Sequence, residues 1–148
     1  MSSIWKNIAT LGPVGYIPFA PGTFGSLIGL ILFTLLRPSA VFLAIIILAG
    51  FFLGVYASSI AEHLFNEKDS GKIVIDEAVG ILVSFLFLPT AAAYLVAAFL
   101  LFRTFDIIKP FPIRHAEKKF RHGFGIMIDD IIAGIYTNIF LHVWMLIF

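Results

Sequence analysis

Residues 126–148 read IMIDDIIAGIYTNIFLHVWMLIF, an apolar stretch interrupted near its start by two adjacent carboxylates, Asp129 and Asp130. A helix of about 20 apolar residues crosses the roughly 30 Å hydrocarbon core of a bilayer, so this stretch is long enough to span a membrane. Backbone polar groups must be paired within the segment in lipid, and we therefore expect a helix. Carboxylates at a membrane boundary are costly to place and are usually functional. The stretch predicts a membrane helix that carries a functional site.

The composition of the whole chain agrees with membrane insertion. The 148 residues are 60% hydrophobic and 13% charged, and the mean hydropathy is +1.02, whereas a soluble domain is about 45–50% apolar and about 25% charged. A net charge of +1 gives no basic field that would indicate nucleic acid binding. The chain has no cysteine, which excludes a disulfide framework, a cysteine nucleophile and a thiolate metal site. The length predicts a single domain over residues 1–148.

Four other apolar runs precede the quoted one, and the five together predict an all-α integral membrane bundle. The runs cover residues 24–36, 41–60, 73–88 and 91–105. The first, third and fourth are short for a full crossing, so we expect some half-spanning helices. We expect the segment before them, residues 1–20, to be irregular or a short surface helix.

Charge is distributed unevenly over the ends of such a bundle. If the five helices alternate in direction, residues 1–20, 61–72 and 109–125 share one side, and Arg37 is the only charged residue on the other. Positively charged loops remain in the cytoplasm during insertion. The charged side is therefore predicted to face the cytoplasm.

Acidic residues lie at this charged end in three of the predicted helices. Asp76 and Glu77 open the third, Asp106 lies at the end of the fourth, and the pair Asp129–Asp130 opens the fifth. Four or five carboxylates in one place repel each other unless a cation neutralises them, and oxygen ligands suit Mg²⁺. The alternative is helix capping, because acids near a helix N-terminus gain about 0.3–1 kcal/mol from the dipole.

Small residues follow both acidic pairs at the distance of one helical turn. Gly80 follows the first pair, and Ala133 and Gly134 follow the second. Residues three or four apart share a helix face, and small residues let membrane helices approach closely. This spacing predicts that the two acidic pairs meet where the two helices cross.

Two cations accompany the acids. Arg103 is three residues before Asp106, on the same helix face, and Lys109 follows three residues later. Arginine binds phosphate with a planar fork and lysine with a point charge, so both are candidate phosphate ligands. The alternative is a local salt bridge with cations that extend to the membrane interface.

A glycine-rich turn opens the first predicted helix at the same end. It reads PGTFGS over residues 21–26, and its candidate ligand residues are Gly22, Thr23, Gly25 and Ser26. Glycines allow the backbone to approach a ligand, and free N–H groups at a helix start bind anions, so the turn is a candidate cradle for a phosphate oxygen. Alternatively, Thr23 or Ser26 is only the N-cap of the helix.

A basic patch lies between the fourth and fifth predicted helices and consists of Arg114, Lys118, Lys119 and Arg121. Basic residues near a membrane attract anionic headgroups with about 1 kcal/mol each. The patch is therefore a candidate headgroup site, or only a signal for topology. We expect the histidines of the same loop to be solvated.

Four blocks of the chain, in order, resemble the phosphatidylglycerophosphatase A family. They are Gly22-Thr23-Phe24-Gly25-Ser26-Leu27, Asp76-Glu77-Ala78-Val79-Gly80, Phe102-Arg103-Thr104-Phe105-Asp106 through Lys109-Pro110-Phe111-Pro112-Ile113, and Gly123-Phe124-Gly125-Ile126-Met127-Ile128-Asp129-Asp130 through Ala133-Gly134. One departure is Arg121-His122-Gly123, where many members carry a Gly-Gly pair before the Gly-Ile-Met run.

The resemblance implies a bacterial inner-membrane enzyme that uses Mg²⁺ to convert the phospholipid phosphatidylglycerophosphate into phosphatidylglycerol and phosphate. By position, it implies that Asp76, Glu77, Asp129 and Asp130 hold the metal, with Asp106, Asp129 and Asp130 as catalytic acids. Arg103 and Lys109 would be phosphate partners. We expect metal-assisted monoester hydrolysis, with Asp129 or Asp130 orienting the attacking water; a covalent aspartyl-phosphate is the alternative.

Two other classes of function remain open from the residues alone. A small cation or proton carrier would place ionisable groups at mid-membrane depth or on both sides, whereas these acids share one side. A structural or assembly subunit would tolerate amide replacements of the acids.

Overall fold

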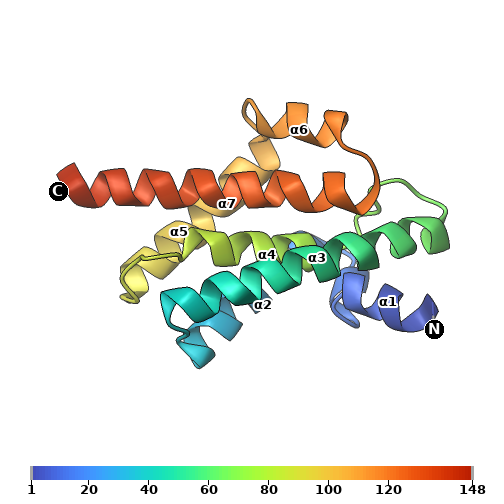
Figure 1. Ribbon diagram of the computed structural model, residues 1–148, viewed down its shortest axis with the longest axis horizontal. Helices are drawn as coiled ribbons and strands as arrows, with labels where there is room; N and C mark the ends of the chain where they lie inside the picture. Colours follow the sequence, from blue (N-terminus) through green and yellow to red (C-terminus); the bar gives the residue numbers. More distant parts are fainter. Residues whose placement is uncertain (1, 148) are drawn as a thin grey trace.

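The computed structural model describes residues 2–147, apart from the side chains of Glu117 and Lys118, and over that range it is entirely helical (Figure 1). Its elements are α1 (Ser2–Ala9), the 3₁₀ helix η1 (Val14–Tyr16), α2 (Pro21–Leu36), α3 (Ala40–Phe65), α4 (Ile75–Ser84), α5 (Ala92–Ile108), α6 (Ile113–Lys119) and α7 (His122–Ile147). The prediction of an all-α fold is confirmed for these residues.

Each of the five predicted apolar runs forms one helix, namely α2, α3, α4, α5 and α7. The N-terminal segment contains the short helix α1, one of the two outcomes expected there. Two details differ from the sequence prediction. Helix α2 begins three residues early because Pro21 occupies its first turn, where a missing N–H costs nothing. Helix α6 lies in the stretch expected to be a loop, and the fully buried side chain of Ile113 anchors it.

Two helices, α3 and α7, are long and apolar enough to cross a membrane. Each has 26 residues, about 39 Å at 1.5 Å per residue. Large apolar side chains project outward from α3, among them Leu48 and Phe52, which are 60% and 64% exposed. An outer surface of this kind is typical of a membrane protein, in which lipid covers such side chains.

The short helix α4 lies at the centre of the bundle, in contact with α2, α3, α5 and α7. Every residue of α4 except Asp76 and Glu77 is buried. The stacked rings of Phe33 and Phe85, 4.5 Å apart, pack at the C-terminal end of α4. A helix of only 10 residues therefore forms the core because its neighbours cover it on all sides.

The C-terminal end of α4 receives hydrogen bonds from α7. The last carbonyls of a helix have no partner within it, and lipid offers none. The Asn138 side-chain amide donates to the carbonyls of Ser84 at 3.1 Å and Leu86 at 2.8 Å. Asn138 thus allows α4 to end inside the bundle.

We predict that Asn138→Leu destabilises the protein by about 1–3 kcal/mol, because it leaves buried carbonyls without donors. The measurement is thermal unfolding in detergent. The control is Ile139→Leu, a conservative change at a neighbouring exposed position. Equal melting temperatures for Asn138→Leu and the wild type would show that these two hydrogen bonds do not hold the end of α4.

Candidate functional site

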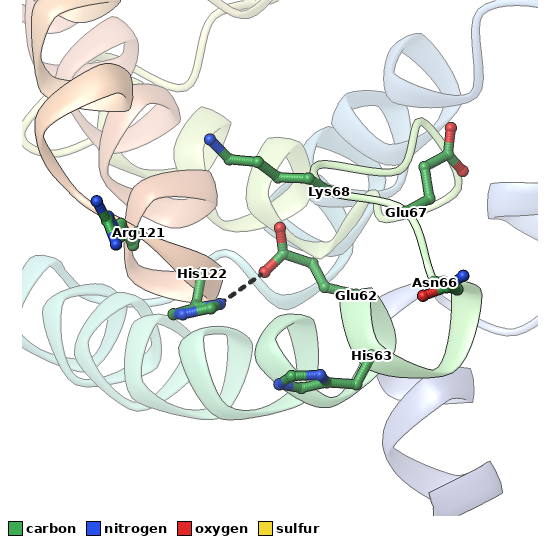
Figure 2. A pocket seen from close by; sticks show the side chains of 7 residues that line it. All are labelled: Glu62, His63, Asn66, Glu67, Lys68, Arg121 and His122. Carbon is green, nitrogen blue, oxygen red and sulfur yellow. Dashed lines mark ion pairs between the residues drawn. The ribbon is translucent and has the colours of Figure 1, made fainter.

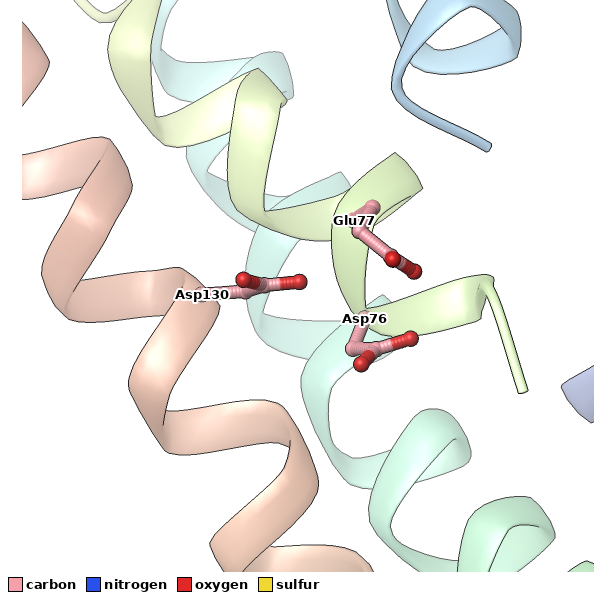
Figure 3. Close-up of side chains that lie close together, drawn as sticks. All are labelled: Asp76, Glu77 and Asp130. Carbon is pink, nitrogen blue, oxygen red and sulfur yellow. The ribbon is translucent and has the colours of Figure 1, made fainter. Parts of the chain in front are cut away.

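Three carboxylates meet where α4 crosses α7 (Figure 3). Asp76 and Glu77 lie in the first turn of α4, and Asp130 lies on the face of α7 turned toward them. One oxygen from each of the three lies within 4.8 Å of the others. We call these three residues the carboxylate triad.

The close crossing depends on the small residues. A Cβ atom at Gly80 would lie 2.7 Å from the Cβ of Asp130, and a Cβ at Gly134 would collide with the carbonyl oxygen of Gly80. Any larger side chain would separate the helices and with them the acids. The prediction that small residues bring the acids of the two helices together is confirmed for Asp76, Glu77 and Asp130.

The triad has the donor set of a cation site. Asp130 is only 2% exposed, and Asp76 Oδ1, Glu77 Oε2 and Asp130 Oδ2 are buried without a hydrogen-bond partner among the described residues. Buried charges are normally paired or bound to metal. Oxygen atoms alone suit a hard divalent cation such as Mg²⁺. The three side chains therefore have the chemistry that Mg²⁺ requires, and they are three of the four residues predicted to hold it; the fourth, Asp129, lies outside the triad.

Arg103 borders the triad from α5. Its Nη1 lies 3.9 Å from Glu77 Oε1 and forms an ion pair with Asp106. The same atom donates to Ser26 Oγ at 3.4 Å. The local salt bridge given as an alternative is thus present, and it also holds the guanidinium beside the triad.

Lys109, the C-cap of α5, pairs with Asp129, the residue before Asp130 of the triad. Its Nζ lies 2.6 Å from Asp129 Oδ2, and Asp129 Oδ1 accepts the backbone N–H of Asp130 at 3.0 Å. Neighbouring residues on a helix point about 100° apart because a turn has 3.6 residues. The structure accordingly places Asp130 in the triad and Asp129 beside Lys109, and Asp106 likewise lies outside the triad with Arg103.

The glycines of the glycine-rich turn leave space for side chains of the site and for the backbone next to α4. A Cβ at Gly22 would overlap the Glu77 carboxylate and lie 3.3 Å from Arg103 Nη1. Gly25 packs on the backbone of Val74, where a Cβ would lie 2.7 Å from the carbonyl oxygen. Close packing therefore explains why both positions are glycine.

The two hydroxyls of this turn do not cap α2. The N-cap is Ala20, and its carbonyl accepts the N–H of Thr23 at 2.9 Å. Ser26 lies one turn further on, donates to the carbonyl of Gly22 at 2.9 Å and accepts from Arg103. The alternative that Thr23 or Ser26 is the N-cap is wrong, because Pro21 starts the helix before either of them.

The predicted basic patch is divided between two hollows. Arg114 lies with Lys109 and His115 in one, whereas Arg121 lies with His63 and His122 in another, shown in Figure 2. Lys119 is exposed on α6. The side chain of Lys118 lies outside the described part of the chain.

Sequence reasoning missed Glu62, which lies in the hollow of Figure 2. Its side chain is 8% exposed, accepts the N–H of Asp69 at 2.9 Å and lies 3.5 Å from His122 Nδ1. Glu62 therefore ties the turn after α3 to the start of α7. The feature of the sequence that could have identified Glu62 is the position of an acidic residue in the last turn of a long apolar helix.

Comparisons with known proteins point to one family. The family model described as Phosphatidylglycerophosphatase A matches residues 7–145. A protein of Haemophilus influenzae named Phosphatidylglycerophosphatase A is 41% identical, over 95% of this chain and 96% of its own. One of the same name from Escherichia coli is 36% identical, over 93% and 81%.

A third relative has a different name. A Putative phosphatidylinositol-3-phosphatase of Bacteroides thetaiotaomicron is 37% identical, over 87% of this chain and 86% of its own. No solved structure matches the chain. Because the family model covers nearly all of the sequence, the chain belongs to the phosphatidylglycerophosphatase A family, a family of phosphatase enzymes.

Proposed function

We propose that this protein hydrolyses the terminal phosphate monoester of phosphatidylglycerophosphate to give phosphatidylglycerol and inorganic phosphate. Family membership and two relatives with that activity in their names support the substrate. The observation that carries the chemistry is the carboxylate triad, with its unpartnered oxygens, beside Arg103 and Lys109. The third relative is named for a phosphoinositide instead, so the chemistry shared by the three names is removal of a phosphate monoester from a phospholipid headgroup.

Asp76, Glu77 and Asp130 would hold a divalent cation, which we assign as Mg²⁺ on the basis of their all-oxygen donor set. When bound, Mg²⁺ supplies Lewis-acid polarisation of the phosphate and offsets its charge. The chain's own residues then bind and orient the reactants, which is most of what phosphoryl transfer requires.

The cations have different tasks at the phosphate. Arg103, fixed by Asp106 and Ser26, offers its planar fork to the phosphate oxygens. Lys109, which pairs with Asp129, offers a point charge. Asp129, held by Lys109 and by the Asp130 N–H, is assigned to orient the attacking water.

We assign the protein to the bacterial inner membrane as a multi-pass protein with its site toward the cytoplasm. The N-terminus, the C-terminal end of α3 and the start of α7 lie at one end of the molecule, and the turn between α2 and α3 lies at the other (Figure 1). Among the described residues, Arg37 in that turn is the only charged residue at the far end. The positive-inside rule then gives the orientation, and the one-sided charges do not favour a carrier.

We predict that phosphate release from phosphatidylglycerophosphate in mixed micelles requires Mg²⁺, stops with EDTA, and falls at least about 100-fold in Asp130→Asn, because that change removes one of three charged oxygen donors. The matched control is Glu67→Gln, the same acid-to-amide change at an exposed position of the same end. Full activity in EDTA, or in Asp130→Asn, would reject the proposed chemistry.

We further predict that Mg²⁺ raises the melting temperature of the wild-type protein, because a ligand present at about 100 times its dissociation constant stabilises the folded state by about 2.7 kcal/mol. The shift should disappear in Asp76→Asn and persist in Glu67→Gln. This measurement needs no substrate. An equal Mg²⁺ shift in all three proteins would place the cation elsewhere.

A further inference from the structure

A second hollow adjoins the site at the turn between α5 and α6. It is lined by Ile108, Lys109, Pro110, Phe111, Arg114 and His115, and we call it the α5–α6 pocket. Among the side chains that the structure describes, its lining contains two basic residues and a histidine, and no acid. This distinguishes it from the hollow of Figure 2, where Glu62 and Glu67 accompany the cations.

Contacts of Phe111 and Ile113 hold the α5–α6 pocket against the rest of the protein. The Tyr136 hydroxyl on α7 donates to the carbonyl of Phe111 at 2.9 Å, and the fully buried Ile113 anchors α6. Arg114 Nη2 lies 3.5 Å from the carbonyl of Ile108, so its guanidinium reaches back across the pocket. The lining is therefore held in place, while the Arg114 side chain itself is exposed.

Lys109 belongs to both the pocket and the catalytic site. It lines the α5–α6 pocket, and its Nζ lies 2.6 Å from Asp129 Oδ2, next to the carboxylate triad. The pocket and the catalytic site are therefore separated by about the length of the Lys109 side chain. A ligand with two anionic groups joined by a short linker would place one group in the pocket and the other in the catalytic site.

Apolar surface adjoins the same pocket. Ile107, Ile108 and Phe111 are 69%, 60% and 82% exposed. Exposed apolar side chains beside basic ones fit an amphiphile with an anionic head and apolar tails better than a soluble anion.

We propose that the α5–α6 pocket binds the internal phosphodiester of the lipid substrate while the terminal phosphate monoester lies at the carboxylate triad. This inference rests on the proposed function, because phosphatidylglycerophosphate carries both phosphates, separated by one glycerol unit. Arg114 is the main diester ligand, with His115 beside it and Lys109 between the two phosphates. The pocket would therefore select a lipid with a diester over one whose monoester is attached directly to diacylglycerol.

The test compares Arg114→Gln with Lys68→Gln, which removes an equal charge from an exposed position at the same end of the molecule and outside the pocket. Substrates are phosphatidylglycerophosphate and phosphatidic acid, which has the monoester but no diester. Phosphatidylglycerol, which has the diester but no monoester, serves as the competitive inhibitor.

We expect Arg114→Gln to raise KM for phosphatidylglycerophosphate about tenfold, the size of one charge-assisted hydrogen bond, with little change in kcat, since the contact is equal in ground and transition states. The inhibition constant of phosphatidylglycerol should rise by the same factor. The rate of phosphatidic acid hydrolysis by Arg114→Gln should differ from that of the wild type by less than about twofold. All kinetic and inhibition constants of Lys68→Gln should also stay within about twofold of the wild type, as is usual for surface substitutions.

Three results would overturn the proposal: no change in Arg114→Gln, equal losses on both substrates, or an equal loss in Lys68→Gln, which would indicate general attraction of anionic lipid.

If the wild type does not cleave phosphatidic acid, the inhibition constants of phosphatidylglycerol alone decide between these outcomes. If it releases no phosphate from phosphatidylglycerophosphate, the proposed function fails. Binding of the same variants to phosphatidylglycerol in phosphatidylcholine nanodiscs then still tests the pocket, with equal binding by Arg114→Gln and wild type counting against it.

Discussion

The contact between Gly80 and Gly134 sets the geometry of everything around it. At this point α4 and α7 approach so closely that a Cβ atom on either glycine would collide with the other helix. Membrane helices associate through such packing, because lipid gives no hydrophobic force between them. The acids lie one turn away, so the crossing that packs the bundle also forces Asp130 against Asp76 and Glu77. Packing supplies the free energy that keeps these like charges together.

The charge balance of the site would link the proposed cation binding to substrate binding. Five carboxylates surround the site, namely Asp76, Glu77, Asp106, Asp129 and Asp130, against two cations, Arg103 and Lys109. With all of them ionised, five minus two leaves three uncompensated negative charges. A phosphate monoester is itself an anion, so it would be repelled at short range in this poorly screened environment. A bound divalent cation would therefore serve the approach of the substrate as well as the reaction.

Much of this site could be predicted from the sequence, because its acids and small residues follow the spacing of a helical turn. The spacing of Gly80 after Asp76, and of Gly134 after Asp130, gave both the crossing and the meeting of the acids. The choice between Asp129 and Asp130 was not readable, since it depends on the rotation of α7 about its axis, which packing with α4 decides. Asn138 was missed for a similar reason: its role appears only once α4 is seen to end at Ser84, opposite α7. Helix α6 was missed because its seven residues are mostly polar and one buried side chain, Ile113, fixes it.

The depth of the site follows from the lengths of its helices. Asp129 lies seven residues after His122, the first residue of α7, which corresponds to about 10 Å along the helix axis. The turn with Lys109 folds over this level, and exposed apolar residues flank it. In the proposed membrane placement, the phosphate of a lipid would reach that depth without leaving the bilayer, because its tails would remain in the hydrocarbon beside the exposed side chains of Ile107 and Phe111. The first turn of the short helix α4 lies at the same level as Asp130. In the proposed membrane placement, the carboxylates would face the headgroup layer, where a charged site is least costly to hold. In the proposed function, the short helix α4 would thus be the feature that allows a membrane bundle to present acids to a lipid headgroup.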